Sequence, residues 1–588
     1  MMKASESVHN LWHSLRPLVT RAITSGQVLW PQCTLVPADP DVLCEYDVEI
    51  LLPDGLILLA HVFRSRKAQA EGRKLPVVMC AHPYDNHKLP ALGQTPLGGA
   101  PQQYRLIPQS GGKPTFSDIT SWESPDPNFW VKAGYAVVNL NLPGYGGSQG
   151  MATVMSDHQS KCYYEAIEWV ARQTWCSGAV GLNGVSYLAI TQFHVAACRK
   201  YGGPPPALKC IVPWEGLSDV YRDTICPGGV DDAGFLTFWW TTEVKPALTT
   251  SDTEFAQHND GLVTDILDKH PLFDSFWQEK AAPVDEITIP MLVCGSFSDH
   301  GLHTQGSFRA YNRARSTHKW IYTHRAGKWD VFYSPEVQNL TKQFMDCFVK
   351  GEHDNGFLSR PPVMLEVRSS RDVVYERRDE SAWPLPGVSW SQLLLGPSSL
   401  VRSAPAESTE LSYDCESGRI TLDYISEKDI EVIGEMKLRL WVEARSRPGQ
   451  SSVPDDLTLF VAVDKVDAKG QPVRFYGSIG HTDDWVTRGF CRVSRRELDP
   501  VHSKPWLPVY LGTSVHPLTP GEVVPVDIAL YPSSTFFSAG ESIRLVISSK
   551  EIIGTPPYYK KTITGPGRCV VHVGAKYGSF LLIPEISK

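Results

Sequence analysis

Ser186 stands in the stretch "GLNGVSYLAITQF" (residues 181–193), between an apolar strand-like run and a helix-like run. A serine hydroxyl is a poor nucleophile unless a neighbouring base, usually a histidine oriented by a carboxylate, takes its proton. The tight turn that exposes such a serine needs small neighbours, and Gly184 is one of them. Leu188 replaces the second glycine of a G-x-S-x-G pattern, so Ala189 is the nearest small residue on that side. The same residues fit an ordinary serine at a turn, but their placement favours a nucleophile.

The acid and the base of such a serine should follow it in the chain. Asp299 ends the apolar run "IPMLVCGSFSD" and is the predicted acid, although an aspartate there can also cap a turn or a helix. The histidines after it are His300, His303, His318 and His324. We expect His324 to be the base, because it follows the strand-like run "KWIYT", where a last sheet strand would deliver it to the site. His318 precedes that run, and the two histidines on the loop of Asp299 are expected to be structural or to lie at the rim.

Two tyrosines are predicted to bind the oxyanion of the tetrahedral intermediate. One donor is normally the backbone N–H of the residue after the serine, which here is Tyr187. The other comes from the loop after an early strand, here "AHPYDNHK" (residues 81–88), in which Tyr84 offers a phenol O–H. The alternative for Tyr84 is a turn aromatic that packs under a cap.

The elements that must position these residues alternate from about Asp47 to Lys350. Strand-like runs such as "LPVVMCAHPY" and "IPMLVCGSFSD" alternate with helix-like runs such as "HQSKCYYEAIEWVARQTW". This alternation predicts an α/β fold, with a mostly parallel sheet covered by helices on both faces. Ligands bind such sheets at the carboxyl ends of the strands, which is where Tyr84, Ser186 and Asp299 fall.

Between about residues 224 and 285 the sequence has no strand-like runs and shows the pattern of helices. A helical insertion between two sheet strands would form a cap over the strand ends. The aromatic residues predicted to line a substrate pocket in or beside this cap are Trp214, Phe235, Phe238, Trp239 and Trp240. Packing of the same helices on the core is an equally good interpretation. The predicted divisions are 1–223 for the first part of the sheet with an N-terminal amphipathic helix, 224–285 for the cap and 286–355 for the second part.

The texture of the sequence changes after "KGEHDNGFLSRPPV". Short runs such as "MKLRLWVEA", "LTLFVAVDKVD" and "SIRLVISS" alternate apolar and polar residues, with Gly, Pro and Ser at the turns between them. Such runs are typical of antiparallel strands with one buried face. Residues 356–588 are therefore predicted to form an all-β jelly roll or sandwich.

Composition limits the classes of function. The 588 residues carry a formal net charge of −8 with no basic stripe, which argues against a nucleic-acid partner. No run approaches the ~20 apolar residues of a membrane helix, and the first residues lack the pattern of a signal peptide. The 13 cysteines form no C-x-x-C pair and the histidines lack ligand spacing, so we expect no metal, no cofactor and no disulfide framework. These features predict a cytoplasmic protein, and the small-molecule substrate that we expect follows from the predicted pocket and from the resemblance given next.

Several stretches resemble the cocaine-esterase-like hydrolases, the CocE/NonD family, to which Xaa-Pro dipeptidyl-peptidases, glutaryl acylases and α-amino-acid ester hydrolases are related. "HPYDNHK" resembles the T-P-Y-x-K loop of this family, "GLNGVSYLA" its G-x-S-Y-x-G elbow, and "VPWEGLSDVYRDTICPGGV" the segment that enters its cap. "PLTPGEVVPVDIALYPSSTFFSAGESIRLVISS" resembles its C-terminal jelly roll. The resemblance spans about residues 45–585 and implies an α/β-hydrolase sheet with an inserted helical cap, followed by a jelly roll.

The resemblance also implies roles for the site residues. It makes Ser186 the nucleophile, Asp299 the acid, and Tyr84 and the Tyr187 amide the oxyanion donors. The base is where this chain departs from the family, which usually shows G-P-W-x-H after the last strand. The chain has "YTHRAGKWDVFY" there, and His324 is the one histidine in that stretch.

Three functions remain open on the sequence. The first is hydrolysis of an ester or amide of a small or medium organic molecule through an acyl-enzyme on Ser186. The second is transfer of the same acyl group to an alcohol, an amine or an internal carbon, as in acyltransferases and cyclases. The third is a non-catalytic binding protein on a degenerate hydrolase fold. Xaa-Pro peptidase action would need a negatively charged site that binds the free amino terminus of the substrate. Glu215 and Asp219 could form such a site, but they are equally well explained as structural carboxylates. Homodimerisation is compatible with this architecture.

Overall fold

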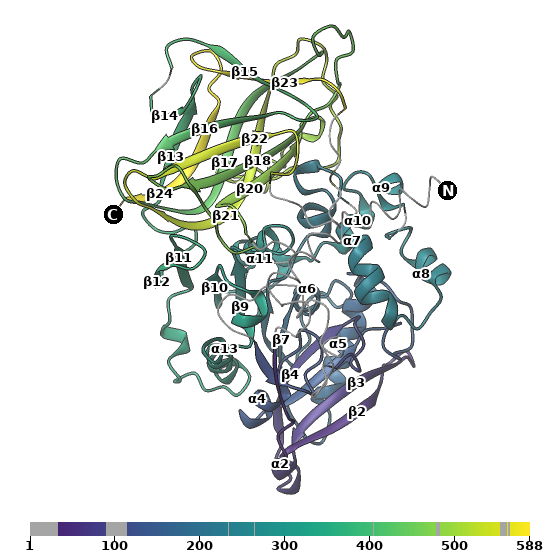
Figure 1. Cartoon of the computed structure of the whole chain (residues 1–588). Helices are drawn as coiled ribbons and strands as arrows, with labels where there is room; N and C mark the ends of the chain where they lie inside the picture. Colours follow the sequence, from purple (N-terminus) through teal and green to yellow (C-terminus); the bar gives the residue numbers. More distant parts are fainter. Residues whose placement is uncertain are drawn as a thin grey trace, which may run out of the picture.

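A computed structural model describes residues 33–89, 114–232, 234–263, 265–403, 405–477, 483–552, 561 and 565–587. The amphipathic helix expected within residues 1–26 lies outside these ranges. In the described chain, a sheet flanked by helices occupies one end and a β-rich part occupies the other, with α11 (Thr304–Arg313) lying between them (Figure 1).

One sheet carries the strand ends that matter for the site. Its strands are β2 (Val42–Leu51), β3 (Ile57–Ser65), β6 (Ala136–Asn141), β4 (Leu75–His82), β7 (Cys176–Val185), β8 (Leu208–Trp214), β9 (Met291–Ser296), β10 (Lys319–His324) and β11 (Val363–Arg368), in that order across the sheet. β2 and β3 are antiparallel to their neighbours, and the strands from β6 to β11 are parallel. The continuous apolar runs of the sequence form the parallel strands because both faces of these strands are buried.

Helices cover both faces of this sheet. A Cβ on Gly181 would lie 2.5 Å from the sulfur of Met345 in α13 (Pro335–Phe348), whereas one on Gly184 would lie 2.6 Å from Cβ of Leu188 in α6 (Tyr187–Ala196). Residues three apart on a strand face opposite sides, so the two helices lie on opposite faces. The remaining helices of this part are α2 (Arg66–Ala70), α4 (Pro127–Lys132), α5 (Asp157–Ala171) and α12 (Lys328–Phe332), and a small parallel pair joins β1 (Thr34–Val36) to β5 (Thr115–Ser117).

The described residues between β8 and β9 form short helices joined by turns. These are η1 (Tyr221–Ile225), η2 (Pro227–Gly229), α7 (Gly234–Trp239), η3 (Trp240–Val244), η4 (Lys245–Ala247), α8 (Asp252–His258), α9 (Ile266–Lys269), α10 (Ser275–Lys280) and η5 (Val284–Glu286). A capping box of Ser251 and Glu254 starts α8, and the ring of Trp240 stacks on Phe255 at 3.7 Å. The segment thus has its own apolar contacts. Arg222 also donates hydrogen bonds to the carbonyl oxygen atoms of Tyr510 and Leu511, at 3.1 and 2.9 Å.

The C-terminal part is mostly β. One antiparallel set consists of β13 (Ser389–Leu395), β14 (Leu400–Val401), β15 (Thr409–Asp414), β17 (Ile430–Arg445), β21 (Val524–Phe537), β23 (Arg568–Val573) and β24 (Phe580–Ser587). The other consists of β16 (Arg419–Ile425), β18 (Thr458–Val466), β19 (Pro472–Val473), β20 (Thr487–Arg492) and β22 (Ser542–Ser548). β12 (Val374–Glu380) pairs with β11, and two short helices, η6 (Phe357–Ser359) and η7 (Val493–Arg495), lie before β11 and after β20.

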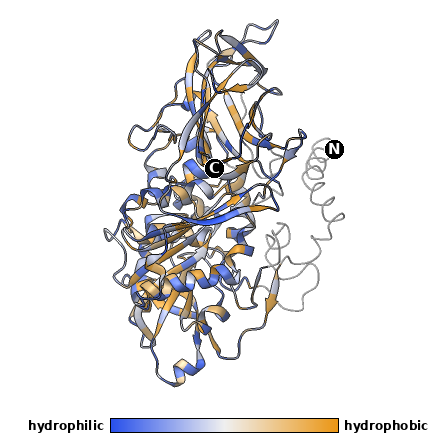
Figure 2. Cartoon of the chain, turned by 90° about the vertical axis from the view of Figure 1, so that its left-hand side faces the viewer, coloured by the Kyte–Doolittle hydropathy of each residue, from blue (hydrophilic) through white to orange (hydrophobic). Residues whose placement is uncertain are grey.

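A single apolar core joins the two β sets, with alternate residues of β17, such as Leu438, Leu440 and Val442, buried in it. Figure 2 shows hydrophobic residues on the strands in the interior of both parts. The jelly-roll strand order predicted from the sequence remains a prediction.

No helix among the described residues is both long and apolar enough to cross a membrane.

Candidate active site

Ser186 occupies a strained turn between β7 and α6. Its φ is +58°, a left-handed value that costs free energy for any residue with a side chain and that clusters at functional sites. Gly184 has φ +155°, and its missing Cβ leaves room for Leu188, the residue that replaces the second glycine of the sequence pattern. A Cβ on Gly216 would lie 2.9 Å from Cβ of Ala189, which explains why a small residue is needed there. Ser186 itself is partly exposed among buried neighbours.

His303, not His324, contacts Ser186. The Ser186 hydroxyl lies 3.1 Å from Nε2 of His303, and Nδ1 of His303 lies 2.5 Å from Oδ2 of Asp299. The backbone N–H of His303 also donates to the carbonyl of Asp299 at 3.2 Å, so one helical turn separates the two side chains and places them together at the start of α11. The spacing Asp299-x-x-x-His303 is the signal in the sequence that could have identified this pair.

The prediction that His324 would reach Ser186 is wrong. His324 is the last residue of β10, and its Nε2 lies 3.1 Å from Oε1 of Glu215, the residue after β8. Its ring stacks on Trp214 with 6.1 Å between ring centroids, and His324 and Glu215 are both buried. The neighbouring strand end supplies the Glu215 carboxylate as the partner of the His324 imidazole, whereas the Ser186 hydroxyl has His303 as its partner.

Lys328 is a fourth member of the cluster that the sequence analysis did not identify. Its buried ammonium nitrogen lies 2.8 Å from Oδ2 of Asp299, 3.0 Å from Nδ1 of His303 and 3.9 Å from Oε2 of Glu215. Oδ2 of Asp299 therefore accepts hydrogen bonds from both His303 and Lys328. The signal for Lys328 was its place in "GKWDV", which differs from the proline of the family pattern.

Lys328 shifts the protonation equilibria of both partners. Burial works against the charged form of Asp299, but the charge of Lys328 and the hydrogen bonds from His303 and Lys328 outweigh it and hold the pKa of Asp299 well below its usual range. Burial lowers the pKa of His303, and the charge of Lys328 lowers it further. At neutral pH this arrangement favours an ionised Asp299 beside a neutral imidazole, the state in which Nε2 can accept a proton from Ser186.

A second carboxyl group behaves differently from Asp299. Burial raises the pKa of Glu123 to about 8, against the lowering effect of Lys328 and of the hydrogen bond from Trp329. The indole N–H of Trp329 donates to Oε1 of Glu123 at 3.1 Å, and the backbone carbonyl of Glu123 accepts from the amide of Val185, next to the serine. Glu123 is thus predominantly a neutral acid at pH 7 and supports the turn that carries Ser186.

The two tyrosines predicted as oxyanion donors lie next to one another. Their ring centroids are 6.3 Å apart, and the indole N–H of Trp239 in α7 donates to the phenol oxygen of Tyr84 at 3.1 Å. Among the described residues no acceptor is found for the phenol hydrogen of Tyr84, which leaves it available to donate. Tyr187 is the first residue of α6, and the first N–H groups of a helix have no acceptor within the helix. The loop of Tyr84 is fixed by Asn86, whose side chain donates to the carbonyl of Asn139 at 2.7 Å.

The five aromatic residues predicted to line a pocket separate into two groups. Trp239 stacks on Tyr187 with 5.6 Å between ring centroids and contacts Tyr84, and Phe235 and Phe238 lie partly exposed on the same helix. Trp214 and Trp240, in contrast, are buried in the core and are 0% and 6% exposed. Trp214 packs against His324 and Trp240 against Phe255. That these two line a pocket stays a prediction.

A cavity of about 320 Å³ lies between α11, the helical segment and the C-terminal part. Its lining includes Arg222, Arg309, Trp383, Glu435 and Tyr531. The described residues that line it do not include Ser186, Asp299 or His303. It is therefore separate from the cluster around the serine.

One set of potential metal ligands adjoins this cluster. Single ligand atoms of Glu215, Cys294 and His324 lie within 4.8 Å of one another. Burial raises the pKa of the Cys294 thiol well above its usual value, which disfavours the thiolate form that binds metal. The ammonium of Lys328 beside Glu215 already supplies a positive charge. These residues fit a buried hydrogen-bond network better than a metal centre.

Comparison with known proteins supports the fold and the class of the chain. The model of the X-Pro dipeptidyl-peptidase (S15) family matches residues 54–330, and that of the X-Pro dipeptidyl-peptidase C-terminal non-catalytic domain matches residues 355–582. A solved CocE/NonD family hydrolase from Staphylococcus aureus is similar over 93% of this chain and 94% of its own, with 34% identity and a TM-score of 0.80.

Two curated esterases are more distant relatives. The cocaine esterase of Rhodococcus sp. is 26% identical over 62% of this chain, and the match spans 64% of the length of that esterase. A putative serine esterase of Mycobacterium bovis is 23% identical over 72% of this chain and 79% of its own length. The α-amino acid ester hydrolase, at 15% identity and a TM-score of 0.65, shares the fold.

Proposed function

Because the chain belongs to the CocE/NonD family of hydrolases, we propose that it is a serine hydrolase that cleaves an ester or amide bond of a small or medium organic molecule through an acyl-enzyme on Ser186. One observation carries this proposal. The hydrogen-bonded series from Ser186 to His303 to Asp299 starts at a strained, partly exposed serine and ends at a buried carboxylate. An ordinary serine at a turn needs neither the strain nor the series.

The first half-reaction forms the acyl-enzyme. Oγ of Ser186 attacks the carbonyl carbon of the substrate while Nε2 of His303 takes the hydroxyl proton, and Asp299 stabilises the resulting imidazolium through Nδ1. The carbonyl oxygen becomes an oxyanion that accepts from the phenol of Tyr84 and the backbone N–H of Tyr187. Each such donor is worth about 3–4 kcal/mol in related acyl transfer. The bond to the alcohol or amine then breaks, and the leaving group takes the proton from His303.

The second half-reaction returns the serine. Water gives one proton to Nε2 of His303 as its oxygen attacks the acyl carbon, and the Ser186–acyl bond breaks with return of that proton to Oγ. The products are a carboxylic acid and the free enzyme. The roles require no metal ion and no organic cofactor.

The relatives favour an ester as the bond that is cleaved. Two of the curated proteins similar to this chain are esterases by name, and their matches cover 62% and 72% of this chain. Trp239, which contacts both oxyanion tyrosines, and the partly exposed Phe235 and Phe238 offer an aromatic surface for an apolar acyl or alcohol group.

The test is covalent labelling of the serine. A fluorophosphonate probe should label the purified protein once, at Ser186 by peptide mass spectrometry, and Ser186→Ala should lose both the label and the hydrolysis of p-nitrophenyl esters. Ser307→Ala is a matched control, since Ser307 is a buried serine whose hydroxyl bonds to the backbone N–H and carbonyl of Gly216. A protein that hydrolyses esters equally well with Ala at position 186, or that takes the label elsewhere, refutes the proposal.

A further inference from the structure

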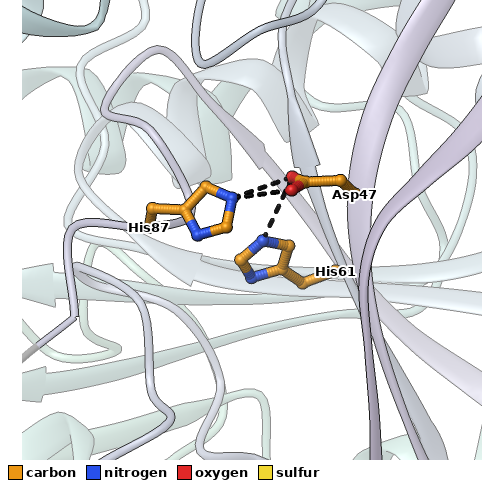
Figure 3. Close-up of side chains that lie close together, drawn as sticks. All are labelled: Asp47, His61 and His87. Carbon is orange, nitrogen blue, oxygen red and sulfur yellow. Dashed lines mark hydrogen bonds and ion pairs between the residues drawn. The ribbon is translucent and has the colours of Figure 1, made fainter.

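Two imidazoles and a carboxylate meet at a site distinct from the active site. Asp47 lies in β2, His61 in β3 and His87 in the loop after β4, and Figure 3 shows both imidazole rings directed at the Asp47 carboxylate. Nε2 of His87 lies 2.9 Å from each carboxylate oxygen, and Nε2 of His61 lies 3.6 Å from Oδ1. The sequence analysis predicted no metal ligands here, because 14 and 26 residues separate these three positions along the chain.

A strained bulge brings Asp47 to this position. The register of β2 against β3 shifts between Glu45 and Val48, and Asp47 has φ +51°. Bulges re-aim side chains and recur at functional sites, and a left-handed φ is unfavourable for a residue with a side chain. The bulge places the carboxylate between His61 and His87 instead of in the regular alternation of the strand.

His61 is the observation that points to a ligand. Its side chain is 0% exposed, and neither ring nitrogen has a hydrogen-bond partner among the described residues. A neutral imidazole keeps a lone pair, and buried polar groups without a partner are rare in folded proteins.

The spacing of the ligand atoms suits a tetrahedral ion. The three ligand atoms lie within 4.8 Å of one another. A tetrahedral zinc ion with bonds of about 2.0–2.1 Å separates its ligand atoms by roughly 3.3 Å, which falls between the two His–Asp distances given above. The side chains of Asp47 and His87 are 43% and 52% exposed, so an ion could enter from solvent and keep a water molecule as its fourth ligand.

A third set of potential metal ligands in the described chain differs from this one because an arginine contacts its carboxylates. Glu410, Glu443 and His572 also come within 4.8 Å, but Arg445 donates hydrogen bonds to both carboxylates. Among the described residues, no lysine or arginine forms an ion pair with Asp47. Within the part of the chain that the structure describes, the polar partners of the Asp47 carboxylate are the two imidazoles.

We propose that Asp47, His61 and His87 bind a divalent transition-metal ion, with Zn²⁺ as the ion that this ligand set fits best. Two imidazole nitrogens exclude Mg²⁺ and Ca²⁺, which take oxygen ligands. The ion joins the β2–β3 pair to the Ala81–Lys88 loop, which also carries Tyr84. It is therefore a structural clamp on that loop, and its presence does not depend on the proposed catalytic activity.

The test titrates chelator-treated full-length protein with Zn²⁺ by isothermal calorimetry. His87→Gln and Asp47→Asn change exposed side chains and leave the buried His61 intact. The matched control is His516→Gln, because His516 is 48% exposed and lies 3.1 Å from Glu497 without a third ligand. We expect the wild type and the control to bind one equivalent of Zn²⁺ with equal affinity. Each site variant should bind it at least about 100-fold more weakly, a larger loss than is usual when a residue that only orients a metal ligand is changed.

Co²⁺ provides the second measurement. Its visible spectrum in the wild type should show ligand-field bands without a thiolate charge-transfer band, and His87→Gln should abolish them. The proposal is overturned if the wild type binds Zn²⁺ no more tightly than His87→Gln, if His516→Gln loses the same binding, or if the spectrum reports cysteine ligands. A fluorophosphonate label on Ser186 that is unaffected in these variants separates this result from the proposed function.

Discussion

Replacing each of two histidines in turn distinguishes the two assignments of the base. His303→Gln removes the imidazole 3.1 Å from Ser186, and glutamine cannot accept the hydroxyl proton and pass it on. In a serine triad the loss of the histidine costs a factor on the order of 10⁶ in kcat, which is roughly 8 kcal/mol of transition-state stabilisation. Hydrolysis left in this variant reflects binding and the oxyanion donors alone.

His324→Gln should behave differently, because His324 contacts Glu215 and not Ser186. A glutamine amide can keep a hydrogen bond to Glu215, so we expect kcat to stay within about tenfold of the wild-type value. The cost should appear as stability, since the stacking on Trp214 is lost and the buried Glu215 is less well satisfied. We expect the free energy of unfolding to fall by about 1–3 kcal/mol.

The assay is the burst and steady-state hydrolysis of a p-nitrophenyl ester, with urea unfolding of the same preparations. The urea curves show whether each variant is folded, so that a lost rate is not confused with a lost structure. A His324→Gln enzyme that loses three or more orders of magnitude in kcat while His303→Gln remains active would refute the assignment of His303. It would also mean that the hydrogen bonds from Ser186 to His303 and from His303 to Asp299 are not those used in catalysis.

Two further predictions concern the groups around this pair. Tyr84→Phe should lower kcat by about 10²–10³ with little change in KM, because one oxyanion donor is lost. Trp239→Phe keeps the Tyr84 phenol and should lower kcat less than tenfold. Equal losses of kcat in the two variants, measured with the same ester, would contradict the role of Tyr84. Lys328→Met removes a charge that lowers the pKa of His303, so the imidazole should protonate at higher pH and the acidic limb of the kcat/KM profile should move to higher pH. Lys328→Arg keeps the charge and should leave that limb in place, and a profile unchanged in the methionine variant would show that Lys328 does not act on the base.

Much of the fold could be predicted from the sequence, because the period of the apolar residues changes with the type of element. The continuous apolar runs that became β4, β7 and β9 indicated buried parallel strands, and the alternating runs after residue 356 indicated a β-rich part. The turn at Ser186 was predictable for the same reason, since strand, small residues and helix follow one another directly. Its strain and its exposure are properties of the folded chain.

The aromatic residues of the helical segment could not be separated by sequence alone. Trp239 and Trp240 are adjacent, and successive residues of a helix point about 100° apart, so one can face the tyrosines while the other enters the core. Which of the two does so depends on Phe255, fifteen residues later, against which Trp240 packs. That contact is tertiary and has no local signature.

The position of the proposed base follows from geometry and not from order along the chain. An acid and a histidine one helical turn apart share a face, so the loop after β9 can supply both Asp299 and His303. The family pattern would instead place its histidine at Val331, within α12. In this chain that helix contributes Lys328, whose ammonium reaches the same carboxylate oxygen that accepts from His303.

The ammonium of Lys328 changes the acid and base strength of the His303 imidazole. A neighbouring ammonium makes the imidazolium a stronger acid and the imidazole a weaker base. In the proposed mechanism, the attack by Ser186 then has less driving force, but the leaving group receives its proton more readily and the base stays neutral at lower pH. A substrate with a poor leaving group gains most from this exchange, because protonation of its departing atom limits the rate. If His303 is the base as proposed, Lys328 therefore influences, through the pKa of His303, which class of bond is cleaved fastest.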